Sequence, residues 1–216
     1  MKKSTKIISG ILSLALVFTC GIGATLAYLQ KTAVPVTNTF VAKDLIEDNV
    51  NDFVLKEHEA VLQKDETYKL NETETTANKY KVVPGATLPK DPFVRVKVQE
   101  NAYLFVEVEN KLAAGMSYTV DTENWKETTL TGKHGGKVYV RLVNNAEAAN
   151  EYVLEPTVPS KEVTFTILDP ETISVLPTFN PKDATGEVAL NFYGFLSQAD
   201  GFSTPEASWA ATFGAN

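Results

Sequence analysis

The sequence predicts an all-β protein, an antiparallel two-sheet sandwich of jelly-roll-like form with one short helix at its C-terminus. Three observations lead to this prediction. Short runs in which apolar and polar residues alternate recur along most of the chain. Turn residues such as glycine, proline and asparagine separate these runs, on the order of every dozen residues. A capped helical pattern occurs only near the C-terminus. Such a pattern is typical of sandwiches built from about nine or ten short strands.

The first 27 residues have the three parts of a secretory signal: a basic start, an apolar run and small residues before a cleavage site. The apolar run extends from Ile7 to Phe18, and the predicted cut lies between Ala27 and Tyr28. We therefore expect residues 1–27 to be removed as a signal peptide and residues 28–216 to form one secreted domain. The expected location is the extracellular matrix or the cell surface, with membrane contact only before cleavage.

Two alternatives to a cleaved signal are weaker. A retained anchor needs roughly 20 apolar residues, and Gly21 and Gly23 interrupt this shorter run. A lipoprotein would be modified at Cys20, but Phe18 and Thr19 before it do not fit that signal. Cys20 is the only cysteine, so a chain cut after residue 27 has no disulfide.

The net charge argues against nucleic acid and anionic membranes as partners. The whole chain carries a formal charge of −7, and removal of Lys2, Lys3 and Lys6 takes it to −7 − 3 = −10. No basic cluster follows in the remaining sequence. A protein without a basic patch is not attracted to phosphate groups.

The segment after the predicted cut, residues 28–41, has the pattern of a β-strand. Val34, Val36 and Phe40 share one face of that strand. Pro35 has no backbone N–H to give to a ladder, which restricts the segment to an edge or an end of a sheet. These four residues make the segment a candidate polymerisation strand, although it is equally able to serve as the first strand of its own sheet.

The next part of the chain, Lys56 to Lys81, is charged and threonine-rich, and we expect a long surface excursion that contains one hairpin or stays partly mobile. Regular alternation returns at Val94–Val98 and at Leu104–Val108. The simplest interpretation is one antiparallel hairpin with an apolar inner face. In that hairpin, the basic row of Arg95 and Lys97 would meet an acidic row on the second strand, Glu107 and Glu109.

Shorter strands are expected along the rest of the chain, and the last of them is apolar on both faces, which predicts a central position in a sheet. The C-terminal helix is expected to begin after the cap Thr204 with Pro205 in its first turn, and to pack through Trp209. The expected strands are 116–120, 128–130, 137–143, 152–154, 162–168, 173–176 and 188–196.

The sequence offers no set of catalytic residues, and we predict neither an enzyme nor a cofactor or metal site. His58-Glu59 begins like a zinc-protease HExxH helix, but Leu62 stands where the second histidine is needed, so a solvated loop histidine is expected. His134 lies in a glycine-rich stretch that predicts a hairpin tip. Two further possibilities stay open: a calcium site near Asp48 to Asp52, and an isopeptide bond between lysine and asparagine side chains.

Three stretches carry a resemblance to a known family. They are Gly21–Leu45, which contains Asn38-Thr39-Phe40 and Ala42 after the Ala27-Tyr28 cut; Pro84–Asn110, a Pro-Gly turn followed by two strands; and the closing pattern of Ala199, Gly201, Phe202 and Trp209. The first two resemble the TasA/CalY (camelysin) family of Gram-positive biofilm matrix proteins, and the third is similar to related secreted proteins of gut Firmicutes. In that family, the stretch matching Asn38-Thr39-Phe40 leads into a strand that contains a glycine. Here Ala42–Glu47 lacks this glycine, which leaves the register of the first strand open.

The resemblance implies a jelly-roll subunit that a SipW-type signal peptidase trims during export and that assembles with itself into extracellular fibres. In such fibres, the freed N-terminal strand of one subunit completes the sheet of the next. The physical basis is β-augmentation, in which an extended segment satisfies the unpaired N–H and C=O groups of an edge strand. The alternatives are a monomeric adhesin that presents Lys56 to Lys81, and a camelysin-like protease, against which the missing catalytic residues argue.

Overall fold

The computed structural model describes residues 45, 52–143, 162–184 and 186–214. One compact unit extends from Lys43 to Asn216. The signal peptide 1–27, its cut between Ala27 and Tyr28, and the candidate strand 28–41 with Val34, Pro35, Val36 and Phe40 lie outside the described residues. So do the expected strand at 152–154 and most of the Asp48–Asp52 stretch.

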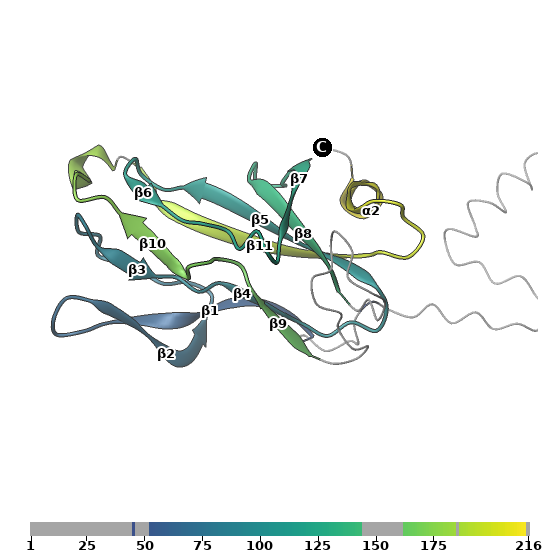
Figure 1. Ribbon diagram of the computed structural model, residues 1–216, viewed down its shortest axis with the longest axis horizontal. Coiled ribbons are helices and arrows are strands. Elements are labelled where there is room, and N and C mark those ends of the chain that lie inside the picture. The colour runs from purple at the N-terminus through teal and green to yellow at the C-terminus, as the bar shows by residue number, and fades with distance from the viewer. Residues whose placement is uncertain (1–44, 46–51, 144–161, 185, 215–216) are drawn as a thin grey trace, which may run out of the picture. The chain divides into compact units, whose positions relative to one another are not determined.

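The described chain is an antiparallel β-sandwich with one α-helix, which confirms the predicted fold class (Figure 1). Strands form three sheets rather than the expected two, and the chain crosses repeatedly from one sheet to another, as in jelly-roll-like sandwiches.

The first sheet has the order β2-β1-β4-β9, with β1 Phe53–Leu62, β2 Tyr68–Thr75, β4 Phe93–Val96 and β9 Val163–Thr166. The second has the order β11-β5-β8-β7, with β5 Ala102–Lys111, β7 Lys126–Thr131, β8 Lys137–Val143 and β11 Ala189–Gln198. The small sheet has the order β3-β10-β6, with β3 Thr87–Pro89, β6 Met116–Ser117 and β10 Thr172–Val175.

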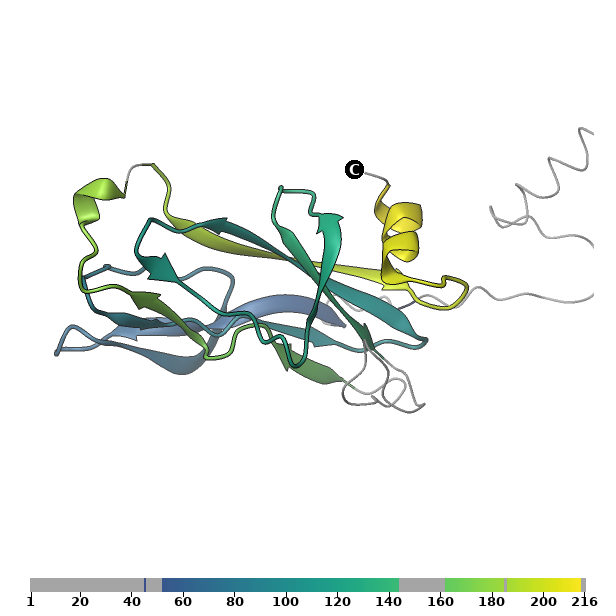
Figure 2. The ribbon, with the colours of Figure 1, turned by 45° about the horizontal axis from the view of Figure 1, so that its top comes forward.

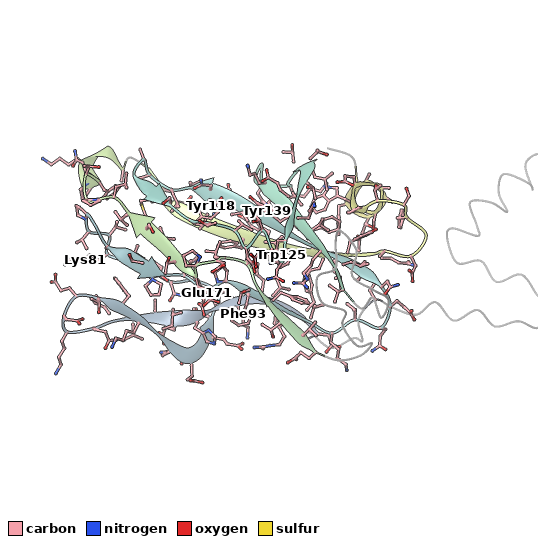
Figure 3. All side chains as sticks on the ribbon, viewed as in Figure 1. Lys81, Phe93, Tyr118, Trp125, Tyr139 and Glu171 are labelled. Atoms are coloured by element: carbon pink, nitrogen blue, oxygen red, sulfur yellow. The ribbon has the colours of Figure 1, made fainter. Side chains whose placement is uncertain are left out.

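The main core lies between the first and second sheets. Val94 and Val96 of β4 contribute from one side and Leu104 and Val106 of β5 from the other, and all four are fully buried. Trp125, just before β7, lies between the layers (Figure 3), where its indole N–H donates to Thr166 O of β9 at 2.7 Å. This bond satisfies the one polar group of a buried tryptophan, so the ring can fill the core without cost.

The two strands expected to form one hairpin, Val94–Val98 and Leu104–Val108, belong to different sheets, so that prediction is wrong. β4 pairs with β1 and β9, whereas β5 pairs with β11 and β8. The chain from Lys97 to Asn101 therefore crosses the sandwich instead of turning back within one sheet. Two strands that face each other across a core show the same alternation as two strands paired in a sheet, so the pattern alone does not distinguish them.

The expected row of Arg95 and Lys97 against Glu107 and Glu109 is also wrong as a consequence. Arg95 instead forms an ion pair with Glu74 of β2 in its own sheet. Glu107 is fully buried beneath the tip of the β7–β8 hairpin. Opposite charges at matching positions of two strands therefore indicate a cross-strand pair only when the strands share a sheet.

The last strand, expected to be central, is instead an edge strand among the described residues. β11 is paired with β5 along ten residues, from Ala189↔Lys111 to Gln198↔Ala102. The central strand is β5, which is buried on both faces from Ala102 to Val108. An apolar sequence on both faces indicates burial of both faces, and it carries no information about hydrogen bonding at the strand's edge.

The excursion predicted from Lys56 to Lys81 contains the hairpin of β1 and β2, which confirms the hairpin that was expected there. Its strand β1 starts before the excursion, at Phe53 inside the first sheet, where it pairs with β4. The turn is formed by Gln63 to Thr67, with Gln63 N donating to Thr67 O at 2.7 Å. The excursion is therefore an extension of a core strand.

Helix α2, Pro205–Phe213, begins as predicted: the Thr204 side chain accepts from Ala207 N at 3.2 Å, and Pro205 opens the first turn. Figure 2 shows α2 on the side of the second sheet that faces away from the first. Trp209, 1% exposed, packs there against Phe105 and Phe195 with ring centroids 5.0 Å apart in each case. The helix therefore covers part of the outer face of the second sheet. No helix in the described part of the chain is long and apolar enough to span a membrane.

Candidate functional site: an open sheet edge beside a groove

The candidate site begins with the unpaired edge of β11. Among the described residues, β11 has β5 as its single neighbour in the sheet. A strand of this length presents an edge of about 33 Å, along which alternate residues direct N–H and C=O groups away from the sheet. Such an edge is a template for pairing with another segment unless the sequence protects it.

The other long edges of the two main sheets are protected by charge, and β11 is not. β2 carries Lys69, Glu72 and Glu74, and β7 carries Lys126 and Glu127. The remaining edge strands in the described residues are short: four residues in β9, three in β3, which ends in proline, and two in β6. The sequence of β11, ALNFYGFLSQ, has no charged residue. The unprotected edge is thus the one with the longest ladder.

A groove of about 740 Å³ runs beside this edge, between β1 of the first sheet and β11 of the second. Its walls come from Leu55–Glu57, from the segment 76–80 after β2, and from Val188–Tyr193. At Gly194 the two sheets come close together: a Cβ added at that glycine would lie 3.1 Å from Cζ of the Phe53 ring. Apolar side chains supply the deeper lining: Leu88, Leu112, Met116, Ile173 and Leu190.

One ion pair lies within this apolar lining. Lys90 Nζ is 2.6 Å from Glu57 Oε2, and the two side chains are only 12% and 5% exposed. The same ammonium is 5.7 Å from the centre of the Phe192 ring of β11. A pair so far removed from water interacts through a lower effective dielectric than a surface pair does, and each of its two side chains can form more than one hydrogen bond.

Three other polar side chains that line the groove, those of Tyr80, Asn78 and Asn191, have hydrogen-bond partners within the subunit. Tyr80 donates to Pro89 O at 2.5 Å, and burial, together with the charge of Glu57, raises the pKa of Tyr80 well above its usual range. The Asn78 side chain accepts from Ala60 N at 2.8 Å and donates to His58 O at 2.7 Å. Asn191 donates to Glu109 at 2.8 Å.

His58, expected as a solvated loop histidine, lies in strand β1 instead, so that prediction is wrong. Its Nδ1 is 2.6 Å from Asp91 Oδ2, and its backbone N–H donates to Asp91 Oδ1 at 3.0 Å. The double contact ties β1 to the residue after Lys90 and so fixes the backbone that carries the ion pair. His134 lies at the tip between β7 and β8, as predicted, where its ring stacks on Tyr193 at 3.6 Å.

No three histidine, cysteine, aspartate or glutamate side chains lie close enough together to hold a metal ion in the portions of the chain that are described. Among these residues, the geometry favours binding of a chain segment: an unpaired ladder, a neighbouring apolar groove and one buried polar pair. No family model, curated protein or solved structure matches the chain.

Sequence reasoning placed the candidate site at Val34, Pro35, Val36 and Phe40, which lie outside the described residues, and it did not identify the edge and groove. One sequence signal was available: the ten residues of β11 contain no charge, in a chain that has 47 charged residues from 20 basic and 27 acidic ones. The absence of charge becomes informative only once the fold shows that β11 is an edge strand, because natural sheet edges are commonly protected by charge.

Stability is expected to decline in acid through two carboxylates near this site. Hydrogen bonds from Arg95 and then Lys56 lower the pKa of Glu74 to about 2, and bonds from Asn191 and Lys111 lower the pKa of Glu109 to about 2. The unfolded pKa of glutamate is about 4.3, so their stabilisation is complete above that value and is lost as the pH falls through about 2. Thermal melts from about pH 6 to pH 2 should show this decline, and Glu74→Gln combined with Glu109→Gln should flatten it. The same dependence of melting temperature on pH in the unchanged chain and in the double variant would contradict the assignment.

Proposed function

We propose that this chain is a secreted structural subunit of extracellular biofilm matrix fibres, in which residues 28–41 of one subunit pair with β11 of the next. The observation that carries the proposal is the uncharged edge of β11, which no other described strand pairs with and which lies beside an apolar groove. A free edge of this kind is an aggregation hazard for a monomer and an advantage for a polymer. The partner is therefore another copy of the same chain.

The composition of residues 28–41 supports this pairing. The segment has one charged residue, Lys31, so it brings almost no charge to an uncharged edge. Its 14 residues are enough to cover the ten of β11. Val34, Val36 and Phe40 would enter the groove from one face of the added strand, while the backbone completes the ladder.

Export explains how assembly is delayed until the subunit is outside the cell. Before cleavage after Ala27, the segment is joined to the apolar signal run and is held at the membrane. A signal peptidase of the SipW type would release Tyr28 as the new N-terminus and free the strand for a neighbour. The fibre then needs neither a cofactor nor a catalytic step.

Removing the first part of the segment is expected to abolish fibres. A chain that begins at Val36 lacks most of the added strand, so the β11 edge of its neighbour stays unpaired and the subunit should remain a soluble monomer. Electron microscopy and size-exclusion chromatography compare it with the chain that begins at Tyr28. A second variant replaces residues 28–41 by glycine and serine, which keeps the length of the chain and removes the apolar side chains of the segment. Filaments from either altered chain would overturn the proposal.

A further inference from the structure

Between Val34 and Phe40, the candidate polymerisation strand carries one polar residue on the face of its apolar side chains. In an extended segment, residues of equal parity point the same way, so Val34, Val36 and Phe40 share their face with Asn38. A carboxamide taken into an apolar groove costs free energy unless hydrogen bonds replace those it made with water. Asn38 therefore needs a polar partner inside the groove.

The groove offers one pair with matching chemistry. The Lys90 ammonium has three N–H donors, and the Glu57 carboxylate has several lone-pair sites, so their mutual contact at 2.6 Å leaves capacity on both. A carboxamide has a C=O that accepts from Lys90 and an NH₂ that donates to Glu57. By contrast, the side chains of Asn78, Tyr80 and Asn191 already bond within the subunit.

We propose that Asn38 of an incoming subunit binds the Lys90–Glu57 pair and thereby sets the register of the added strand; this inference rests on the proposed function. A slip by one residue turns the apolar row out of the groove. A slip by two keeps that row inside but places Val36 or Phe40 against the ion pair, which then loses water without gaining a hydrogen bond. One buried polar contact thus selects a single register out of several that apolar packing would tolerate.

Cross-linking of engineered cysteines tests this register directly, because the chain from Tyr28 onward contains no cysteine of its own. One subunit carries Asn38→Cys and a second carries Lys90→Cys, and the two are mixed during assembly. A lysine side chain alone spans most of the about 7 Å that a disulfide allows between Cα atoms, so a short bis-maleimide joins the two cysteines, and we expect a covalent dimer on a denaturing gel from this mixture. Thr37→Cys mixed with Lys90→Cys is the control, since residue 37 lies on the opposite face and should give no dimer.

The outcomes separate the inference from the proposed function. A dimer from Val34→Cys or Val36→Cys with Lys90→Cys, in place of one from Asn38→Cys, would overturn the register and leave strand donation intact. Cross-linking only when both cysteines are in one chain would show that the strand pairs within its own subunit, which overturns both. Absence of fibres and of every cross-link would also overturn both.

A thermodynamic cycle tests the contact itself without cysteines. Asn38→Leu changes the strand, and Glu57→Gln with Lys90→Met makes the groove uncharged while leaving no single buried charge unpaired. Each change should raise the critical concentration for assembly about tenfold, and all three together should raise it by much less than about a hundredfold, because the contact is lost only once. A combined increase in critical concentration equal to the product of the two separate increases would overturn the contact. Thermal melts of the uncharged-groove subunit check that it folds.

Discussion

Replacing Phe192 by glutamate is expected to abolish fibre growth while the subunit stays folded. Phe192 lies on β11, lines the groove and is only half-buried. The new carboxylate would lie near the Lys90 ammonium, which is 5.7 Å from the centre of the present ring, so the subunit can accommodate the charge. An incoming strand cannot, because its apolar side chains would have to strip water from the carboxylate. Charge directed inward from an edge strand is a common natural defence against edge pairing.

The matched control is Thr73→Glu, which places the same charge on the edge strand β2, where lysine and glutamate residues already occur. That variant should assemble like the unchanged chain. Turbidity and electron microscopy measure fibre growth, and circular dichroism confirms folding of each variant. Normal fibres from folded Phe192→Glu would rule out β11 as the edge that receives the strand, even if fibres form by another route.

The positions of strands and of the helix were predictable because they depend on local chemistry. The run at 137–143, in which Val138, Val140 and Leu142 alternate with Tyr139 and Arg141, forms β8 with the expected bounds. The cap Thr204 and Pro205 start α2 where the sequence indicated. Glycine and proline at Pro84-Gly85 form a turn, with Gly85 at a φ of 78° that favours glycine. Each of these features can be predicted from a few neighbouring residues of the sequence.

The pairing of strands was not predictable, because it depends on partners far along the chain. Alternation told which residues of β4 and β5 face a core, but not whether the strands lie beside or opposite each other. For the same reason the sequence did not indicate that β11 is an edge strand, or that Lys90 and Glu57 meet across 33 residues. The candidate groove exists only once these pairings are fixed.

Glu107 shows the limit of local reasoning most clearly, because the sequence placed it on an outward charged row and the structure buries it completely. Its Oε1 accepts from His134 N at 2.7 Å and from Gly136 N at 2.9 Å. Its Oε2 is 3.1 Å from the His134 ring. The hairpin tip is built around this carboxylate: a Cβ at Gly132 would lie 2.0 Å from Glu107 Cδ. Glycine at that position is therefore a packing requirement.

Replacing Glu107 by leucine is expected to lower the free energy of unfolding by about 3 kcal/mol, since two backbone N–H groups lose a charged acceptor and leucine offers none. For a domain of this size, that corresponds to a melting temperature lower by about 6 to 12 °C. Glu107→Gln keeps one acceptor oxygen and should cost less. The control on the same hairpin is Glu127→Leu, whose exposed pair with Lys137 should contribute below about 1 kcal/mol. Equal losses at the two positions in thermal and urea unfolding would show that the buried carboxylate does not hold the tip. Because the His134 ring stacks on Tyr193 of β11, the same loss should loosen the outer face of the strand that we propose receives its neighbour.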